Sequence, residues 1–509
     1  MWIALPNLFA ARMDDLVYAE LLFFSVMCSV VVRYIKASIV RQVLSAIIGV
    51  SMVYYFTGVR VLYSMVTVLI AVFIHLFTPY RYMGVMSFII LFLYLGVLRS
   101  VHYFGLPPLE SHANAVQLIL TLRLVGLGYE AQASMIPLQC KTDNSTFRLR
   151  TIPKLKIFDI ISYSYYFPGL FTDILLPINF CAHLLFFVLG PYYTYAMYHD
   201  VISNEHIRNV SVWSHIKWRI YHLLWTCPAF LIFVHLYPLN TLRKPEFCSE
   251  TAFYKIYVGI FIFFWMRCRM YSAWMVAESI CILNGIGIYP KSFISQVSIG
   301  PKKDSPELTF SGHIETSSEA IRNADIFKVE FDSTFRQTVR AWNRSVQFWL
   351  ATFVYKRVPK TFGVFLTMIV SAYWHGVHPG YYLAFISFPL CVLAEDSLFE
   401  LFSKDSMGNP PVIVRATWFV VKHLGLAYMA AGFLLLSYSD TVQYWRSLHF
   451  YFHWLMGTII FCCWIRKALQ TLWNSADIKG LSRTPLVNFL NQRKTIVNDI
   501  IESDNKKRQ

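Results

Sequence analysis

Two histidines interrupt one of the most apolar stretches of the chain. His375 and His378 occur in SAYWHGVHPGYY (371–382), which follows TFGVFLTMIV and precedes LAFISFPLCVLA. An ionisable side chain at membrane depth is energetically costly and by default marks a functional site or a buried polar contact. In such a low-dielectric setting an imidazole stays neutral, and a neutral imidazole can accept a proton. The segment is therefore suited to general-base catalysis on a hydroxyl group.

The residues around His375 favour an irregular backbone. Gly376 removes a side chain next to His375 and would let a substrate approach the main chain. Pro379 and Gly380 would break or kink the helix just beyond. Because irregular backbone at membrane depth is tolerated only where it is buried in protein or lines a cavity, the segment predicts an internal chamber.

Two other interpretations of the histidines need to be weighed. His375 could be a structural residue that bonds a neighbouring helix, and this interpretation stays open beside the catalytic one. His375 and His378 could also bind a metal, because positions i and i+3 share a helix face. Pro379 follows immediately, however, and no cluster of cysteines or carboxylates offers further ligands. We therefore expect no metal site.

The stretch TVRAWNRSVQFWLATFVYKRVP (338–359) predicts an amphipathic helix that stops at Pro359. Its apolar face consists of Trp342, Val346, Trp349, Leu350 and Phe353, and its polar face of Arg340, Arg344 and Gln347. Asn343 lies at the border between the two faces. We expect this helix to lie along the membrane interface or to insert into the protein from the side.

Apolar runs long enough to span a bilayer recur from one end of the chain to the other. They cover roughly residues 16–35, 40–56, 61–77, 82–98, 174–195, 218–236, 253–266, 273–288, 362–388, 412–436 and 450–465. The pattern predicts an all-α, polytopic membrane protein with about ten to twelve transmembrane helices, plus amphipathic or re-entrant helices, around a central chamber.

Composition leads to the same class. The chain is 56% hydrophobic and 15% charged, which leaves too little polar surface for a soluble protein of this length. The net charge of +16 comes from residues at the ends of the apolar runs and in loops, so it indicates cytoplasmic loops and anionic headgroups and not nucleic acid. Most of the ten cysteines lie inside apolar runs, which is not the pattern of a disulfide framework.

The chain is expected to form one membrane domain over residues 1–465, with the His segment at 361–390, followed by a basic polar tail at 466–509. A polar loop at about 291–337 is expected to be mobile in its first half and able to pack in its second half. The chain ends in KKRQ, which matches a dilysine retrieval signal read from the cytosol. This ending predicts an endoplasmic-reticulum membrane protein with a cytosolic C-terminal tail, although an ordinary solvated tail explains it equally well.

The motifs described above resemble those of the membrane-bound O-acyltransferase family. The family has a characteristic His in an apolar helix and an Asn a few tens of residues earlier in a W-N context, which match His375 and Asn343. Within the family, the lysophosphatidylinositol acyltransferase branch is the most similar. Strings that carry this likeness are WNRSVQFWL, SAYWHGVHPGYYL, NAVQLILTLRLVGL, MYSAWMVAESICILNGIGIYP, ETSSEAIRNADIF and LSYSDTVQYW.

One segment departs from the branch pattern. The apolar insert DILLPINFCAHLLFFVLG (173–190) separates SYSYYFPGLFT from GPYYTY, which the branch joins almost directly. An extra span would reverse the sidedness of everything upstream. We therefore expect the insert to be re-entrant, packed laterally or an artefact of the gene model.

The resemblance implies an enzyme that moves a fatty acyl chain, of the polyunsaturated arachidonoyl type, from acyl-CoA to the free hydroxyl of a lysophospholipid, most consistent with lysophosphatidylinositol. It implies that His375 takes the proton from that hydroxyl and that Asn343 orients it or stabilises the oxyanion. Because a thioester is already activated, we expect no bound cofactor and acyl-CoA as co-substrate. The expected partners are the lipid membrane and the two substrates, and the oligomeric state is not specified.

Further residues near the two motifs are candidates for substrate or CoA binding. They are Trp342, Arg340, Arg344, Lys356, Tyr373, Trp374, Gly376 and His378. The arginines suit the phosphates of CoA or of the headgroup, although a solvated basic face at the membrane surface explains the cations as well. His378 is expected to shape the wall beside His375.

Several other polar groups lie in or near the predicted spans. Glu278 and Arg267 fall on one helical face, where they could line the chamber or, as we favour, make structural ion pairs. Asn144, Asn209 and Asn343 each begin a glycosylation sequon. At Asn343 the catalytic interpretation is favoured, because a glycan would block the site.

The main alternative within enzymes is an acyltransferase for another lysophospholipid, with a choline, ethanolamine or serine headgroup. From a different class, a transporter would be expected to carry several charges across multiple helices or broken repeated segments. The spans hold few central charges, so the enzyme is favoured.

Overall fold

The computed structural model describes residues 13–105, 109, 111–135, 149–170, 190–204, 210–301, 315–402 and 410–478. The chain divides into two compact units, Met1–Pro389 with Ile413–Phe450, and Leu390–Val412 with Tyr451–Gln509. All the candidate site residues lie in the first unit. The calls on Asn144, Asn209, residues 173–189 of the insert and the KKRQ end lie outside the described residues.

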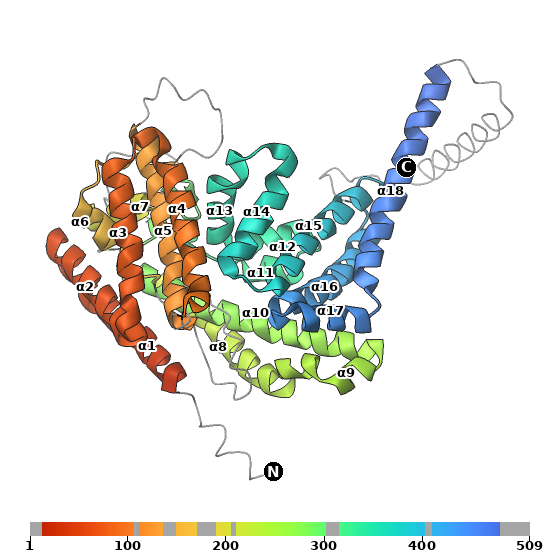
Figure 1. Cartoon of the computed structure of the whole chain (residues 1–509), viewed down its shortest axis with the longest axis horizontal. Helices are drawn as coiled ribbons and strands as arrows, with labels where there is room; N and C mark the ends of the chain where they lie inside the picture. Colours follow the sequence, from red (N-terminus) through yellow and green to blue (C-terminus); the bar gives the residue numbers. More distant parts are fainter. Residues whose placement is uncertain are drawn as a thin grey trace, which may run out of the picture. The chain divides into compact units, whose positions relative to one another are not determined.

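The described part of the first unit is almost entirely helical (Figure 1). Its helices are α1 (Met13–Arg33), α2 (Ser38–Thr57), α3 (Val61–Phe77), α4 (Met83–Ser100), α5 (Ser111–Met135), α6 (Ile157–Ser164), α7 (Tyr195–Ser203), α8 (Trp213–Leu236), α9 (Pro245–Ser249), α10 (Ala252–Leu283), α11 (Ile326–Phe331), α12 (Phe335–Ala341), α13 (Arg344–Phe353), α14 (Lys360–His375), the first half of α15 (Pro379–Phe399), α16 (Val412–Leu435) and α17 (Tyr438–Ser447). Short 3-10 turns are η2 (Gly58–Arg60), η3 (Tyr80–Tyr82), η4 (Val101–Phe104), η7 (Leu239–Arg243), η8 (Glu319–Ile321) and η9 (Tyr355–Arg357). In the second unit α18 (Tyr451–Ile478) pairs with the end of α15 through Lys467 and Glu400.

The predicted all-α, polytopic membrane class is confirmed. Six stretches in the described residues are long and apolar enough to cross a membrane: Ser38–Phe77, Tyr80–Ser100, Trp213–Arg243, Pro379–Phe399, Val412–Leu435 and Tyr451–Trp473. The stretch Ser38–Phe77 contains two helices, α2 and α3. Gly58, at φ 56°, ends α2 and lets the chain turn into α3.

Three of the predicted spans have different boundaries in the structure. The run at 253–266 and the run at 273–288 as far as Leu283 belong to a single helix, α10, because no glycine or proline breaks the chain between them. The run at 362–388 is instead two helices, α14 and α15, which are separated by the residues after His375. Apolar content predicted the segments but not the points at which helices end.

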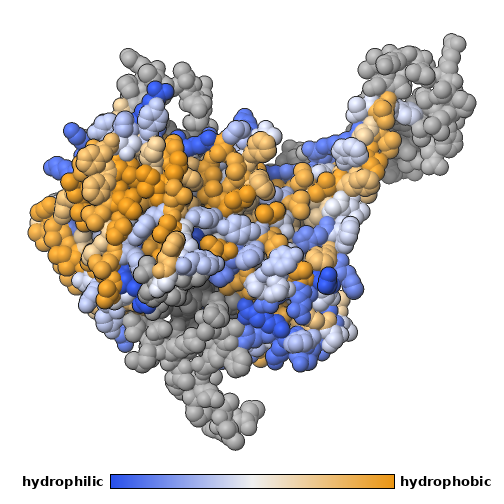
Figure 2. Space-filling view, in the orientation of Figure 1, coloured by the Kyte–Doolittle hydropathy of each residue, from blue (hydrophilic) through white to orange (hydrophobic). Residues whose placement is uncertain are grey.

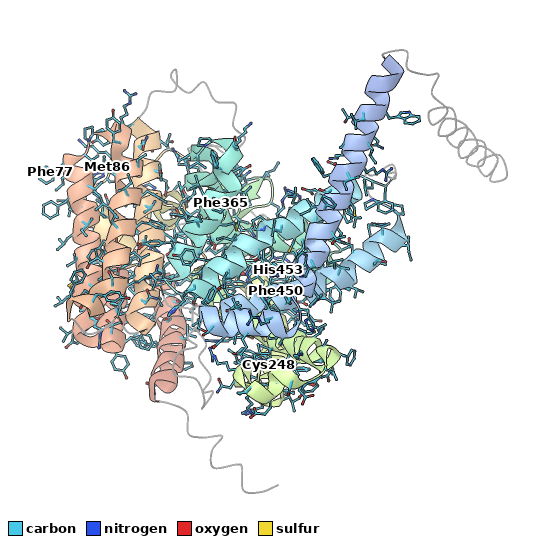
Figure 3. All side chains as sticks on the ribbon, turned by 45° about the vertical axis from the view of Figure 1, so that its right-hand side comes forward. Phe77, Met86, Cys248, Phe365, Phe450 and His453 are labelled. Atoms are coloured by element: carbon cyan, nitrogen blue, oxygen red, sulfur yellow. The ribbon has the colours of Figure 1, made fainter. Side chains whose placement is uncertain are left out.

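Apolar side chains gather over α2, α3 and α4 on the face shown in Figure 2. Leu69 and Phe73 of α3 and Leu93 of α4 are more than half exposed. Exposed apolar side chains also occur at Phe77 and Phe365 (Figure 3). A soluble protein would rarely expose so continuous an apolar surface, so we assign this face to lipid.

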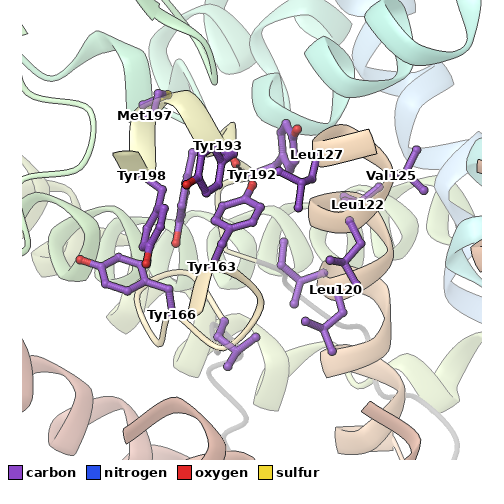
Figure 4. Close-up of a cluster of buried hydrophobic side chains, with 14 of the residues drawn as sticks. Leu120, Leu122, Val125, Leu127, Tyr163, Tyr166, Tyr192, Tyr193, Met197 and Tyr198 are labelled. Atoms are coloured by element: carbon purple, nitrogen blue, oxygen red, sulfur yellow. Dashed lines mark hydrogen bonds between the residues drawn. The ribbon is translucent and has the colours of Figure 1, made fainter. Parts of the chain in front are cut away.

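The core of the first unit is centred on α5, which lies beside α3 and α4 (Figure 1). Leu118 to Val125 of this helix are all at most 2% exposed. In Figure 4 Leu120 and Leu127 of α5 lie on the side of the helix that faces a group of tyrosines, which includes Tyr163, Tyr166 and Tyr193. These rings are completely buried. A helix buried on every side can serve as a fixed reference for the helices packed on it.

Arg123 of α5 is a fully buried cation that binds backbone carbonyls. Its guanidinium donates to the carbonyl oxygens of Tyr166 (2.9 Å) and Pro168 (2.7 Å) and to the Tyr193 hydroxyl (2.8 Å), with longer bonds to two more carbonyls. Irregular backbone cannot satisfy its own carbonyls, so the arginine supplies the missing donors.

Replacing Arg123 with Met should therefore destabilise the protein strongly. Each buried acceptor left without a donor costs about 1–3 kcal/mol, and several lose their donor together. We expect a large fall in the thermal midpoint of the detergent-solubilised protein, measured by fluorescence-detected gel filtration. Arg81→Met, at an exposed position, is the matched control, and equal midpoints for the two variants would contradict this role.

The polar loop predicted at about 291–337 packs in its second half, as expected. Ala320, Ile321 and Asn323 are at most 1% exposed. Of the first half, residues 291–301 are described, and residues 302–314 lie outside the description. Two short antiparallel pairings occur among the described residues, one within residues 291–301 and one that joins the residues just before the loop to the start of its second half. The pairings are β1 (Tyr289–Pro290) with β4 (Thr316–Ser317) and β2 (Ser295–Gln296) with β3 (Gly300–Pro301).

Candidate active site

His375 is the last residue of α14. The Gly376 N–H closes the helix by donating to the Ala372 carbonyl at 3.0 Å, and α15 begins at Pro379. The predicted break therefore falls directly after the histidine. Because α14 ends there, His375 and the exposed His378 do not share a helix face, which removes the reason for pairing them as metal ligands. No group of three or more potential metal-binding side chains occurs within the described residues.

Aromatic rings surround the His375 imidazole. Its ring centre lies 5.3 Å from that of Phe385, nearly parallel, and 5.1 Å from that of Phe433, at a right angle. Tyr381 lies at 5.7 Å. The imidazole is half-buried, and no residue in the described part of the chain hydrogen-bonds its nitrogens. Packing thus holds the ring while its nitrogens stay available to a substrate.

The residues before His375 attach α14 to α4 and α5. The Trp374 indole donates to the Leu118 carbonyl of α5 at 3.2 Å. The Tyr373 hydroxyl donates to the Phe92 carbonyl of α4 at 3.1 Å. A side chain on Gly96 would meet that hydroxyl at 2.0 Å, so the glycine makes room for it. Tyr373 and Trp374, which we predicted to bind substrate, are occupied with helix packing.

The single amphipathic helix predicted over 338–359 is wrong. The structure has two helices, α12 and α13, with a break at Trp342 and Asn343, and then the turn η9. Asn343 is half-buried and has a left-handed backbone, with φ 43° and ψ 53°. Such a conformation is rare outside glycine and is most accessible to Asn and Asp. Helical periodicity alone could not show this break, because the apolar pattern continues across it.

Two tryptophans hold the chain on either side of Asn343. Trp342 packs against Trp274 of α10, with ring centres 4.9 Å apart and an angle of 71°. The buried Trp349 of α13 donates its indole N–H to the Leu122 carbonyl of α5 at 3.0 Å. Asn343 precedes Trp349 by six residues, about 9 Å along a helix.

The helices that carry Asn343 and His375 thus rest on the same part of α5. Leu122 and Leu118 accept the two indole bonds and are one helical turn apart, about 6 Å. The Phe92 ring of α4 lies 6.0 Å from that of Trp349 and 6.1 Å from that of Tyr373, so it contacts both helices. The fold thus packs the two helices that carry the sequence-predicted residues against the same part of α5, although Asn343 and His375 are 32 positions apart.

Comparison with known proteins identifies the family. The model of the membrane-bound O-acyltransferase family matches residues 47–439, which include both candidate residues. The chain belongs to the membrane-bound O-acyltransferase family. Similar proteins include membrane-bound acylglycerophosphatidylinositol O-acyltransferases from Caenorhabditis briggsae (37% identical over 449 residues, 86% of this chain and 92% of the relative), Danio rerio (32% over 456 residues, 86% and 91%) and Homo sapiens (35% over 382 residues, 72% and 76%).

Membership makes the chain a membrane-embedded O-acyltransferase, and the transporter interpretation is set aside. The family match also covers His375 and the aromatic residues that pack around its imidazole. Both motifs that carried the resemblance therefore lie within the part of the chain that matches the family.

The predicted basic residues have different surroundings in the acyltransferase. Arg344 forms an ion pair with Glu319, so its charge is already partly neutralised. Arg340 and Lys356 are exposed, and Arg357 lies over the Tyr129 ring at 4.0 Å. Arg340, Lys356 and Arg357 all lie at the surface, whereas Arg344 is half-buried.

Gly376 and His378 lie at the turn after α14. A Cβ on Gly376 would come within 2.8 Å of the Tyr381 ring, so the glycine is needed for packing next to His375. His378 is exposed, with its ring centre 6.1 Å from that of Tyr381. Both residues thus contact an aromatic ring that also packs on the candidate catalytic histidine.

Glu278 and Arg267 make structural ion pairs, as we favoured, each with a different element. Glu278 pairs with Arg219 of α8 at 2.8 Å, and Arg267 pairs with Glu330 of α11 at 2.8 Å. Burial alone would raise the pKa of Glu330, but the Arg267 guanidinium and the Tyr271 hydroxyl hold it below its ordinary value. Glu330 therefore stays charged at neutral pH and the ion pair persists.

Arg99 of α4 is a site residue that our sequence reasoning missed. Its guanidinium donates to the carbonyls of Tyr373 and Trp374, and it lies over the Tyr373 ring at 5.7 Å. The last carbonyls of a helix have no partner within the helix, and a cation there is favourable. The only signal in the sequence was a lone arginine at the end of the apolar run LFLYLGVLRS.

Replacing Arg99 with Met should lower acyl transfer more than it lowers protein stability. Without the guanidinium, the end of α14 loses two charge-assisted bonds and His375 shifts, and a shift of about 1 Å can cost 10²-fold in rate. We expect a fall in kcat with little change in KM, and partial recovery in Arg99→Lys. Wild-type kcat in a folded Arg99→Met enzyme would contradict this role, with Arg81→Met as the control.

Proposed function

We propose that this acyltransferase moves a fatty acyl chain from acyl-CoA to the free hydroxyl of lysophosphatidylinositol. The relatives named for acylglycerophosphatidylinositol support the headgroup. The observation that carries the reaction is the common support of α13 and α14 by α5, with no hydrogen bond to the Asn343 amide or the His375 imidazole from the described residues. No bound cofactor is required in this scheme, because the thioester is already activated.

In the proposed reaction His375 acts as the general base. Its neutral imidazole takes the proton from the lysophospholipid hydroxyl as the oxygen attacks the thioester carbonyl. The Asn343 amide donates a hydrogen bond to the oxyanion that forms. When the intermediate collapses, the new ester C–O bond is retained and the C–S bond breaks. The CoA thiolate leaves and accepts the proton that His375 carried, so the enzyme returns to its starting state.

The aromatic surroundings of His375 support this role. Phe385, Phe433 and Tyr381 offer no carboxylate that would favour an imidazolium, so the ring remains a base. The same apolar rings suit the acyl chain, which must lie beside the reacting carbonyl. Arg340 and Lys356 are candidates for the phosphates of CoA.

His375→Ala should remove acyl transfer without unfolding the protein. General-base catalysis is worth typically ~10² to 10⁴ in rate, so we expect at least this loss in kcat. Transfer of radiolabelled acyl chains by purified enzyme in detergent measures it, and gel filtration confirms folding. His235→Ala, at an exposed position of α8, is the matched control. Full activity of a folded His375→Ala enzyme would disprove the catalytic role.

A panel of acceptors tests the headgroup. Lysophosphatidylinositol should react faster than lysophosphatidylcholine, lysophosphatidylethanolamine and lysophosphatidylserine, each offered with arachidonoyl-CoA. A second series with saturated and polyunsaturated acyl-CoA tests our proposal that the donor carries an arachidonoyl-type chain. Preference for another headgroup would overturn the substrate assignment and leave the family unchanged.

We also propose an endoplasmic-reticulum membrane location with a cytosolic C-terminal tail. The KKRQ ending supports it, since such a signal is read from the cytosol.

A further inference from the structure

Asn343 occupies the N-cap position of α13 but does not cap the helix. The first N–H groups of a helix have no partners within it, and an Asn at the N-cap usually accepts one of them with its side chain. The Asn343 side chain makes no such bond. Its left-handed backbone, with φ 43°, differs from the extended conformation that capping residues adopt.

Asn323 receives these N–H groups instead. Its backbone carbonyl accepts from the Arg344 N–H at 2.7 Å, and its side-chain Oδ1 accepts from the Ser345 N–H at 3.1 Å. Nearby, the Asp325 N–H donates to the Ala341 carbonyl at the end of α12 at 2.9 Å. The segment 323–325 is thus bonded to the chain on both sides of the break that contains Asn343.

Buried charges hold Asn323 in place. Its N–H donates to Glu278 Oε1 at 2.7 Å, and Glu278 Oε2 accepts from Arg219 at 2.8 and 2.9 Å. Arg219 also donates to the Ser318 hydroxyl at 3.0 Å. Asn323 and Glu278 have no exposed surface, and Arg219 has 3%. The cap is therefore built from three elements, α8, α10 and the segment before α11. These buried contacts fix the position of Asn323 more tightly than an exposed capping side chain would be fixed.

We propose that Asn323 is a positioning residue that caps α13 in place of Asn343 and so leaves the Asn343 amide free to face the substrate. The proposal rests on the role given to Asn343 under the proposed function. It gives the ion pair between Glu278 and Arg219 a role, because Glu278 holds the Asn323 N–H although neither charged residue is a candidate catalytic residue. It also explains how Asn343 can keep an unusual backbone, since the chain is bonded on both sides of it.

A double-mutant cycle tests the proposal in the full-length enzyme. Asn323→Ala should lower kcat by up to about 10²-fold, because the Asn343 amide would be misplaced, and should leave KM within about 3-fold. Asn343→Ala should lower kcat by about 10²- to 10³-fold. In the double variant the losses should not multiply, because Asn323 acts through Asn343.

Controls separate positioning from general damage to the fold. Thr251 caps α10 by accepting from the Tyr254 N–H, so Thr251→Ala removes a cap elsewhere in the same unit. Asn323→Ala should lose far more kcat than Thr251→Ala at a similar loss of thermal midpoint. Asn323→Ser, which keeps an acceptor, should have an intermediate kcat, and it carries the test if the Ala variant does not fold.

The outcomes distinguish the two proposals. If Asn343→Ala keeps wild-type kcat, the role of Asn343 in the proposed function is wrong. If Asn343→Ala loses activity while folded Asn323 variants keep wild-type kcat, the positioning role is overturned. Losses that multiply in the double variant would also overturn it, because the two residues would then act independently.

Discussion

Two backbone carbonyls of one buried helix support both candidate catalytic segments. The Leu118 and Leu122 carbonyls of α5 accept the indole N–H groups of Trp374 and Trp349, one from each segment. A single hydrogen bond contributes only about 1 kcal/mol net, but an indole also buries a large rigid surface. Because α5 is itself enclosed by other helices, a shift of either segment would disturb packing over the whole unit. This constraint makes a common site for Asn343 and His375 physically reasonable.

The two candidate residues lie where helices end, and helix ends leave backbone groups without partners. At the end of α14 the Tyr373 and Trp374 carbonyls are satisfied by Arg99, and at the start of α13 the N–H groups are satisfied by Asn323. In both places a residue distant in sequence supplies the missing partner. The side chains of His375 and Asn343 are then not needed to complete the ends of their helices. Each therefore stays available for a reaction.

Charges inside the first unit follow one rule. Arg123 binds the carbonyls of an irregular segment, Arg219 pairs with Glu278, and Arg267 pairs with Glu330. A buried charge without a partner is costly, especially in a protein embedded in lipid. Breaking such a pair would be strongly destabilising, whereas its net contribution is small. We therefore conclude that these buried charges mainly fix the positions at which loops and helices pack against each other.

The sequence by itself determined the membrane class and most of the apolar segments, because hydropathy is a local property. It also marked His375 as a histidine inside an apolar run, and the family resemblance added Asn343 as the second residue expected to react. It also indicated the break after His375, since Pro379 fixes its own φ and Gly380 is free to leave the helical conformation. Tertiary structure decided where α12 ends and α13 begins, since the apolar period continues through Asn343 and only the bonds to Asn323 make the break stable. The sequence also could not show that Arg99 binds the end of α14 or that Glu278 pairs with Arg219. Each of these contacts joins residues that are far apart in the chain. Periodicity reports which face of a helix is buried, and it carries no information about what that face meets.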